Sequence, residues 1–169
     1  EDMGLIHSED YFDIPVGADQ LFRLGDDAMV AIEICQDAMV PKACHADLAV
    51  NGAEVILNLA ASHELVGKRA YRRDLVKMIS ESCKCVYAYV SAGCTESTSD
   101  LVFSGHSVIA ENGVILAENA EIVASDYLMV QDCDLGRIRA ERRKNATFRN
   151  CAQRYAGGML TTLGGCDTL

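Results

Sequence analysis

Short apolar runs alternate with amphipathic stretches along most of this 169-residue chain. Runs rich in Val, Ile, Leu and Tyr, bounded by Gly, Asp or Asn, are typical of β-strands. Such runs predict strands over residues 21–24, 28–35, 54–60, 85–93 and 127–135. The run at 54–60 is almost continuously apolar, and this pattern predicts a strand that is buried on both of its faces.

Helical spacing appears between these runs. Leu75, Ile79 and Cys83 recur every four positions, which predicts one amphipathic helix over residues 68–83. A shorter helix is expected over residues 42–53, and a polar helix in the basic sequence RIRAERRKN near the end of the chain. We interpret that basic sequence as a solvated helix face rather than a surface for nucleic acid.

The clearest local signal lies at residues 106–118, where two apolar runs flank Asn112-Gly113. This pair favours a two-residue type I′ turn, so the segment predicts a β-hairpin. Strands, helices and hairpin in this order predict an α/β layered domain with a mixed sheet. We expect this domain to span residues 1–149, and residues 150–169, which contain four glycines and no sustained periodicity, to form a linker or a poorly ordered tail.

Composition and charge narrow the possible partners. Half of the residues are hydrophobic, and the formal net charge is -10, so the chain is typical of a globular protein that repels nucleic acid and anionic lipid surfaces. We find no apolar run of about 20 residues for a membrane span, and no signal-peptide pattern. None of the eight cysteines forms a C-x-x-C pair, so no metal site is expected. These features favour the reducing cytoplasm.

The stretch VAIEICQDAMVP contains the first candidate for chemistry, because an apolar strand ends there on Cys35. A free cysteine can pack as a small hydrophobe, but a cysteine at a strand end can also serve as a nucleophile. Glu33 lies two positions earlier and would face the same way along a strand, which makes it a conceivable general base. The residues alone leave both roles of the cysteine open.

Four stretches in order carry a family resemblance: VAIEICQDAMVP, NGAEVILNLAASHELVGKRAYRRDLV, SAGCTESTSDLVFSGHSVIAENGVILAE and DLGRIRAERRKN. With them the chain resembles the nitrilase-like glutaminase domain of glutamine-dependent NAD+ synthetases, within the carbon–nitrogen hydrolase superfamily. The resemblance implies a four-layer α-β-β-α sandwich and a Cys-Glu-Lys triad, with Cys35 as the nucleophile. It also implies that Ser62 contacts the glutamine substrate. The family usually has an acidic residue after the nucleophile, and here that position is Gln36, which can accept a hydrogen bond but brings no charge.

The resemblance further implies that glutamine is hydrolysed through a cysteine thioester. The ammonia would pass to an ATP-dependent synthetase domain of the same chain, which uses ATP and magnesium, while the glutaminase domain itself needs no cofactor. The family's base and lysine lie upstream of the matching stretch, and no lysine precedes Cys35 here. We therefore expect a partial domain that lacks N-terminal elements, forms a homo-oligomer and has little activity by itself. Two alternatives stay open: a non-catalytic module, and an amidase for another small amide.

Overall fold

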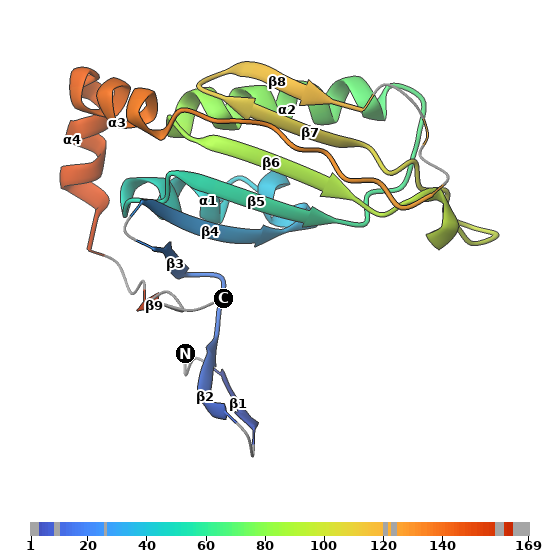
Figure 1. Cartoon of the computed structure of the whole chain (residues 1–169), viewed down its shortest axis with the longest axis horizontal. Helices are drawn as coiled ribbons and strands as arrows, with labels where there is room; N and C mark the ends of the chain where they lie inside the picture. Colours follow the sequence, from blue (N-terminus) through green and yellow to red (C-terminus); the bar gives the residue numbers. More distant parts are fainter. Residues whose placement is uncertain are drawn as a thin grey trace.

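The computed structural model describes the backbone of residues 4–8, 11–25, 27–119, 122, 125–157 and 161–163. A seven-stranded sheet with the order β8-β7-β6-β5-β4-β3-β9 forms its centre (Figure 1). Its strands are β3 (Gln20–Leu24), β4 (Ala28–Ile34), β5 (Val55–Ala60), β6 (Val86–Ser91), β7 (Ser107–Glu111), β8 (Val114–Glu118) and β9 (Thr161–Leu163). Strands β1 (Gly4–Ser8) and β2 (Tyr11–Val16) pair with each other in a separate antiparallel sheet.

The sheet is mixed, as the order of strands and helices predicts. Strands β4, β5 and β6 run parallel, and the connections between them contain α1 (Cys44–Val50) and α2 (Lys68–Cys83). Strand β7 pairs antiparallel with both β6 and β8, and β3 pairs antiparallel with β4. Both helices lie on the same face of the sheet (Figure 1). The carboxyl ends of β4 and β5 therefore meet at one edge of the sheet, where functional side chains collect in α/β proteins.

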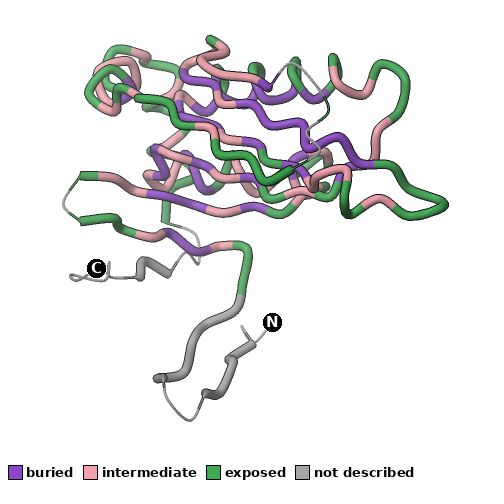
Figure 2. Tube along the Cα trace, turned by 45° about the vertical axis from the view of Figure 1, so that its right-hand side comes forward, coloured by how far each residue is buried: buried purple, intermediate pink, exposed green. Residues whose placement is uncertain are grey.

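The core fills the space between α2 and the sheet. Val76 and Ile79 of the helix pack with Ile56 and Tyr87 of the strands, and all four are almost completely buried. Figure 2 shows that buried positions are concentrated along the strands of the large sheet. This burial explains the four-residue spacing, since one face of α2 has to be apolar to cover the sheet.

The opposite face of the sheet is more open. Ile34, Leu59 and Val90 are neighbours across β4, β5 and β6, and they are 54%, 50% and 50% exposed. We call these three residues the open stripe. The expectation that residues 54–60 are buried on both faces is therefore wrong for Leu59, because in the described part of the chain α1 and α2 cover the other face.

The hairpin prediction is confirmed. Strands β7 and β8 pair antiparallel around Asn112 and Gly113, whose φ angles are 46° and 80°. Two consecutive positive φ angles define the type I′ turn, and asparagine and glycine adopt them at the lowest cost. A local sequence signal was sufficient here because the turn type depends on the backbone preferences of two residues.

Two predictions near the end of the chain differ from the structure. Residues 127–135 do not form a strand; up to Asp134 they are irregular, and Leu128 and Val130 are exposed. The polar helix is confirmed as α3 (Leu135–Lys144), but a further helix, α4 (Ala146–Tyr155), follows it at once. Helix α4 crosses the expected boundary after residue 149, so the chain stays helical for part of the expected tail.

Helix α3 docks through arginines as well as through the buried Ile138. Arg139 pairs with Glu54, with Nε 2.5 Å from Oε1, and Arg142 Nε donates to the carbonyl oxygen of Lys84 at 2.9 Å. The basic sequence therefore binds the body of the domain as well as facing solvent. Of the helices that the structure describes, none combines the length and the apolar character that a membrane crossing requires.

Candidate active site

Cys35 lies at a sharp turn between β4 and the short helix η1 (Cys35–Met39). Its φ angle is +49°, in the left-handed region that residues with a side chain rarely adopt. Such backbone strain is found most often at functional sites, and a strained turn from strand to helix is the local form that exposes a nucleophile in several hydrolases. The geometry at Cys35 therefore suits a nucleophile that a scaffold holds in place.

A side chain from the neighbouring strand supports this turn. Asn58, which is 1% exposed, donates from Nδ2 to the carbonyl oxygen of Cys35 at 3.2 Å. The same nitrogen lies 3.0 Å from the hydroxyl oxygen of Tyr87 and 3.4 Å from Oε1 of Glu33. Just after the turn, Asp37 Oδ2 accepts a hydrogen bond from the backbone nitrogen of Ile34 at 3.1 Å.

Glu33 is buried on the helix side of the sheet. Its Oε2 lies 3.2 Å from Nδ1 of His45 and 3.3 Å from Sγ of Cys44, and its Oε1 accepts from Tyr87. Burial alone would raise the pKa of Glu33, but the hydrogen bonds from His45 and Tyr87 lower it below its ordinary value. Glu33 is thus a buried carboxylate that is held as an anion against α1.

Ser62 lies just beyond the carboxyl end of β5 and is 7% exposed. Its hydroxyl oxygen is 3.4 Å from Nη1 of Arg72. Cys35 follows the carboxyl end of β4, which runs parallel beside β5, so Cys35 and Ser62 leave the sheet at the same edge. Gln36, next to Cys35, is exposed. The structure brings the three residues singled out from the sequence to the same edge of the sheet.

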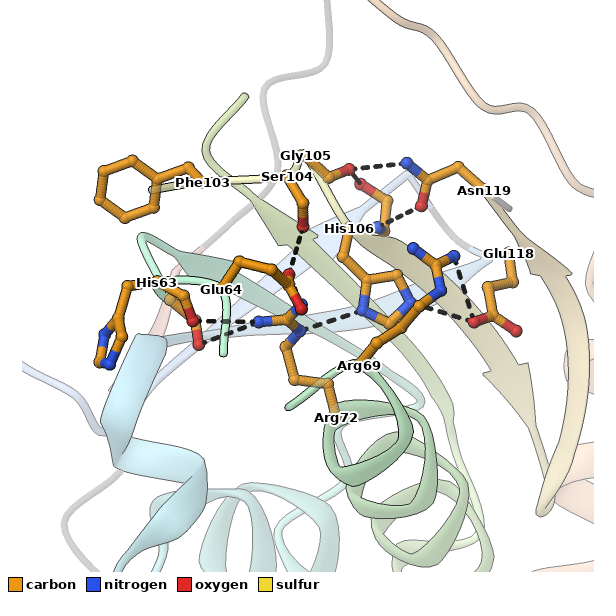
Figure 3. Close-up of polar contacts among 12 residues, drawn as sticks. His63, Glu64, Arg69, Arg72, Phe103, Ser104, Gly105, His106, Glu118 and Asn119 are labelled. Atoms are coloured by element: carbon orange, nitrogen blue, oxygen red, sulfur yellow. Dashed lines mark hydrogen bonds and ion pairs between the residues drawn. The ribbon is translucent and has the colours of Figure 1, made fainter. Parts of the chain in front are cut away.

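A buried polar network fixes the loop that carries Ser62 (Figure 3). Arg72 of α2 is fully buried, pairs with Glu64 and donates from Nε to Nδ1 of His106 at 3.0 Å. His106 Nε2 in turn lies 3.1 Å from Oε1 of Glu118. Burial lowers the pKa of His106, so a neutral ring with its proton on Nε2 fits both contacts. The network joins the loop after β5 to α2 and to the β7–β8 hairpin.

Two features of this region differ from sequence reasoning. Arg72 is a charged residue of the amphipathic helix α2 and His45 lies on the short helix α1, so the sequence pattern gives no sign that either side chain turns inward. Arg72 is instead 0% exposed, and the side chain of His45 is 13% exposed. The partners of both residues come from distant strands and loops, so local periodicity could not reveal them. The only signal was the occurrence of Arg72 in one of the matching family stretches.

The polar groups of this region lack the arrangement of a metal site. Among residues 17–25, 27–119, 122 and 125–157, whose side chains are described, no group of three or more His, Cys, Asp and Glu side chains is placed to hold a metal ion. The edge of the sheet does present the free thiol of Cys35 with the hydrogen-bonding side chain of Asn58 beside its backbone, which suits a thiol nucleophile.

Comparison with known proteins identifies the family. The family model described as carbon-nitrogen hydrolase matches residues 5–143. The glutamine-dependent NAD(+) synthetase of Mycobacterium leprae is 37% identical over 143 residues, which are 83% of this chain and 21% of that protein. The enzyme of the same name from Homo sapiens is 27% identical over 161 residues, 88% of this chain and 22% of that protein. The chain thus spans about a fifth of the length of these curated relatives.

Solved structures give the same picture of the fold. A glutamine-dependent NAD(+) synthetase from Cytophaga hutchinsonii matches 71% of this chain and 18% of its own, with a TM-score of 0.58 and 29% identity. A carbon-nitrogen hydrolase from Helicobacter pylori matches 74% of this chain and 46% of its own, with a TM-score of 0.61 and 16% identity. With its family model, its relatives and its fold in agreement, the chain belongs to the carbon–nitrogen hydrolase family.

Proposed function

We propose that this chain carries the nucleophile of a glutamine amidohydrolase that supplies ammonia for NAD+ synthesis. The observation that supports the proposal most strongly is the left-handed turn at Cys35, beside Ser62 at the carboxyl edge of parallel strands. The relatives at 37% identity are named glutamine-dependent NAD(+) synthetases, which favours glutamine as the substrate and an ATP-dependent synthetase domain, with ATP and magnesium, as the consumer of ammonia.

The reaction begins when the Cys35 sulfur attacks the side-chain amide carbon of glutamine. The carbon–nitrogen bond breaks, the amide nitrogen takes up a proton and leaves as ammonia, and a thioester to Cys35 remains. Water then adds to the thioester carbonyl, and glutamate leaves as the thiol regains its proton. In this proposal Ser62 and Gln36 hold the substrate through hydrogen bonds. Because Gln36 carries no charge, it can accept a hydrogen bond from the substrate ammonium without forming an ion pair.

A direct test is the release of ammonia from glutamine by the longest natural form of the protein that contains this chain. Cys35→Ala should lower the turnover number by about 10³-fold or more, because removing a nucleophile leaves only binding and electrostatic assistance. Cys94→Ala is a matched control, since Cys94 is also partly buried but follows β6. Full ammonia release by Cys35→Ala would contradict the proposal.

A second assay tests the class of substrate. Because Gln36 carries no charge with which to bind the ammonium group of glutamine, an amide without that group is the alternative substrate. The same preparations should be assayed with a short aliphatic amide that lacks the amino acid group. We expect glutamine to have the higher kcat/KM. A preference for the simple amide that also depends on Cys35 would assign the chain to amidase chemistry instead.

A further inference from the structure

We propose that Glu33 and Asn58 are positioning residues that hold Cys35 in its left-handed turn, and that Glu33 does not serve as the general base. The inference rests on the proposed function for its catalytic consequences, but its structural basis is independent. Cys35 has the unfavourable φ angle. Asn58 donates hydrogen bonds to the carbonyl oxygen of Cys35 and to the carboxylate of Glu33.

Asn58 is the direct link to the nucleophile. A left-handed conformation is unfavourable for a residue with a side chain, so neighbouring contacts have to maintain it. The hydrogen bond from Asn58 Nδ2 to the Cys35 carbonyl oxygen comes from an adjacent strand and is shielded from water, since Asn58 is 1% exposed. This hydrogen bond fixes the peptide group between Cys35 and Gln36, and therefore the direction in which the thiol leaves the turn.

Glu33 fixes Asn58 in turn. The two residues are directly opposite each other in the β4–β5 ladder, and Oε1 of Glu33 lies near Nδ2 of Asn58 and accepts from Tyr87. Its Oε2 is engaged by His45 and Cys44 on α1. Both carboxylate oxygens are thus occupied by donors on the helix side of the sheet. A general base needs a free lone pair directed at the proton that it removes, and Glu33 has its oxygens committed elsewhere.

The contacts of Glu33 suggest a substitution that separates positioning from base catalysis. A glutamine at this position can place its amide oxygen where Oε1 lies and accept from Tyr87 and Asn58 as before. Its amide nitrogen can donate to Nδ1 of a neutral His45, which becomes an acceptor. Glu33→Gln therefore keeps the contacts with Tyr87, Asn58 and His45, while it removes the charge and the hydrogen bond that Oε2 accepts from the Cys44 thiol. Glu33→Leu has a similar size and removes the hydrogen bonds as well.

The first experiment measures glutamine turnover in the longest natural form of the protein that contains this chain. Glu33→Gln should keep kcat within about threefold of the parent and retain its pH profile. Asn58→Leu and Glu33→Leu should lower kcat at least tenfold with KM changed less than threefold, because misplacing a reacting atom by about 1 Å can cost about 100-fold. Loss of turnover in Glu33→Gln, with loss of the acidic limb of the pH profile, would overturn the inference and make Glu33 the base.

The second experiment does not depend on activity. Site-resolved iodoacetamide labelling, read by mass spectrometry, gives the rate at Cys35 relative to exposed Cys151 in the same molecule. Asn58→Leu should change this ratio at least fivefold, while Glu33→Gln should leave it within twofold. Ser80→Ala is the matched control, because it removes a buried hydrogen bond to the Cys85 carbonyl oxygen, just before β6 begins.

The two readouts separate the possible failures. A changed labelling ratio in Asn58→Leu supports the positioning role, even if glutamine is never hydrolysed and the proposed function fails. An unchanged ratio in Asn58→Leu, or an equal change in Ser80→Ala, overturns the positioning role whatever the turnover. Circular dichroism melts of each variant identify any that fail to fold, and Tyr87→Phe, which removes a single hydroxyl group, then serves as the milder variant with the same expected direction.

Discussion

His45 and His106 occupy opposite electrostatic surroundings. Burial lowers the pKa of His45, but the hydrogen bond and charge of Glu33 outweigh it, so its pKa is raised above the ordinary 6.5. Burial and the nearby guanidinium groups of Arg69 and Arg72 lower the pKa of His106 below 6.5, against the opposing effect of Glu118. His45 should therefore hold its proton to a higher pH than His106 does.

These shifts predict separate titrations in an NMR experiment on the histidine rings. The midpoint for His45 should lie above pH 6.5 and that for His106 below it. Glu33→Gln should lower the His45 midpoint, because the paired charge is gone, and should leave His106 unchanged. A His45 midpoint below 6.5 in the parent protein would show that Glu33 does not hold its proton.

The same shifts contribute to stability with opposite signs. The stabilisation from His45 is fully present below pH 6.5, and it is lost as the pH rises through the raised pKa of the folded state. The stabilisation linked to His106 is present above pH 6.5 and is lost as the pH falls below that value, because the unfolded chain then takes up the proton more readily. The two contributions partly cancel in a global unfolding curve, so site-resolved titration is the more informative measurement.

The sequence identified individual candidate site residues, but it did not reveal which polar side chains are buried around them. Cys35, Ser62 and Gln36 were singled out by family motifs, and the structure places them at one edge of the sheet. The burial of His45 and Arg72 was not foreseen. Their burial depends on partners such as Glu33 and Glu64, and whether a charged side chain turns inward depends on finding such a partner in the folded chain.

Among the elements, the β7–β8 hairpin gives the sharpest test of local backbone conformation. Gly113 has φ +80°, and a β-carbon there would lie 2.7 Å from Oε2 and 2.9 Å from Cβ of Glu81. Gly67 has nearly the same angle, +81°, but nothing lies within 4 Å of its added β-carbon. The two glycines therefore share the conformational requirement and differ in steric contact.

We predict that Gly67→Ala lowers the free energy of unfolding by about 1–2 kcal/mol, the usual cost of a left-handed alanine. Gly113→Ala should lower it by at least about 1 kcal/mol more, because the side chain of Glu81 and the end of α2 have to move. Urea unfolding of both variants measures the difference. Equal losses would mean that the hairpin does not pack against α2 as closely as described.

Helices and turns that a local sequence pattern specifies were predicted correctly. Segments whose structure depends on packing against distant parts of the chain were not. The helix over residues 68–83 is confirmed with the predicted bounds as α2. The apolar run at 127–135 fails as a strand, since in the part of the chain that the structure describes it pairs with no strand of the sheet. Helix α4 packs beside α1 and α3 with no residue fully buried, so it lacks the buried apolar face that reveals α2 in the sequence.

For the molecule as a whole, the open stripe is the feature with the clearest consequence. Ile34, Leu59 and Val90 present half-exposed apolar side chains in one row across the sheet. Contiguous apolar surface of this kind is usually covered by another protein surface. We therefore predict that the isolated chain self-associates through this face, in line with the homo-oligomer expected from the sequence.

Light scattering coupled to size-exclusion chromatography tests this prediction. The mean mass should exceed that of one chain and rise with concentration, and Leu59→Lys should shift it toward the monomer. Val66→Lys is the control, because Val66 is fully exposed in the loop before α2 and lies outside the stripe. A monodisperse monomer at every concentration, with a sharp thermal transition, would contradict the prediction.

The central claim of this account is that Cys35 is the nucleophile, and a covalent intermediate tests it most directly. The longest natural form of the protein that contains this chain is mixed with glutamine, quenched in acid and digested, and its peptides are analysed by mass spectrometry. We predict a γ-glutamyl thioester on the Cys35 peptide, none on the Cys44 or Cys94 peptides, and loss of both the adduct and ammonia release in Cys35→Ala. Ammonia release that persists in Cys35→Ala, or an adduct on another residue, would contradict the assignment.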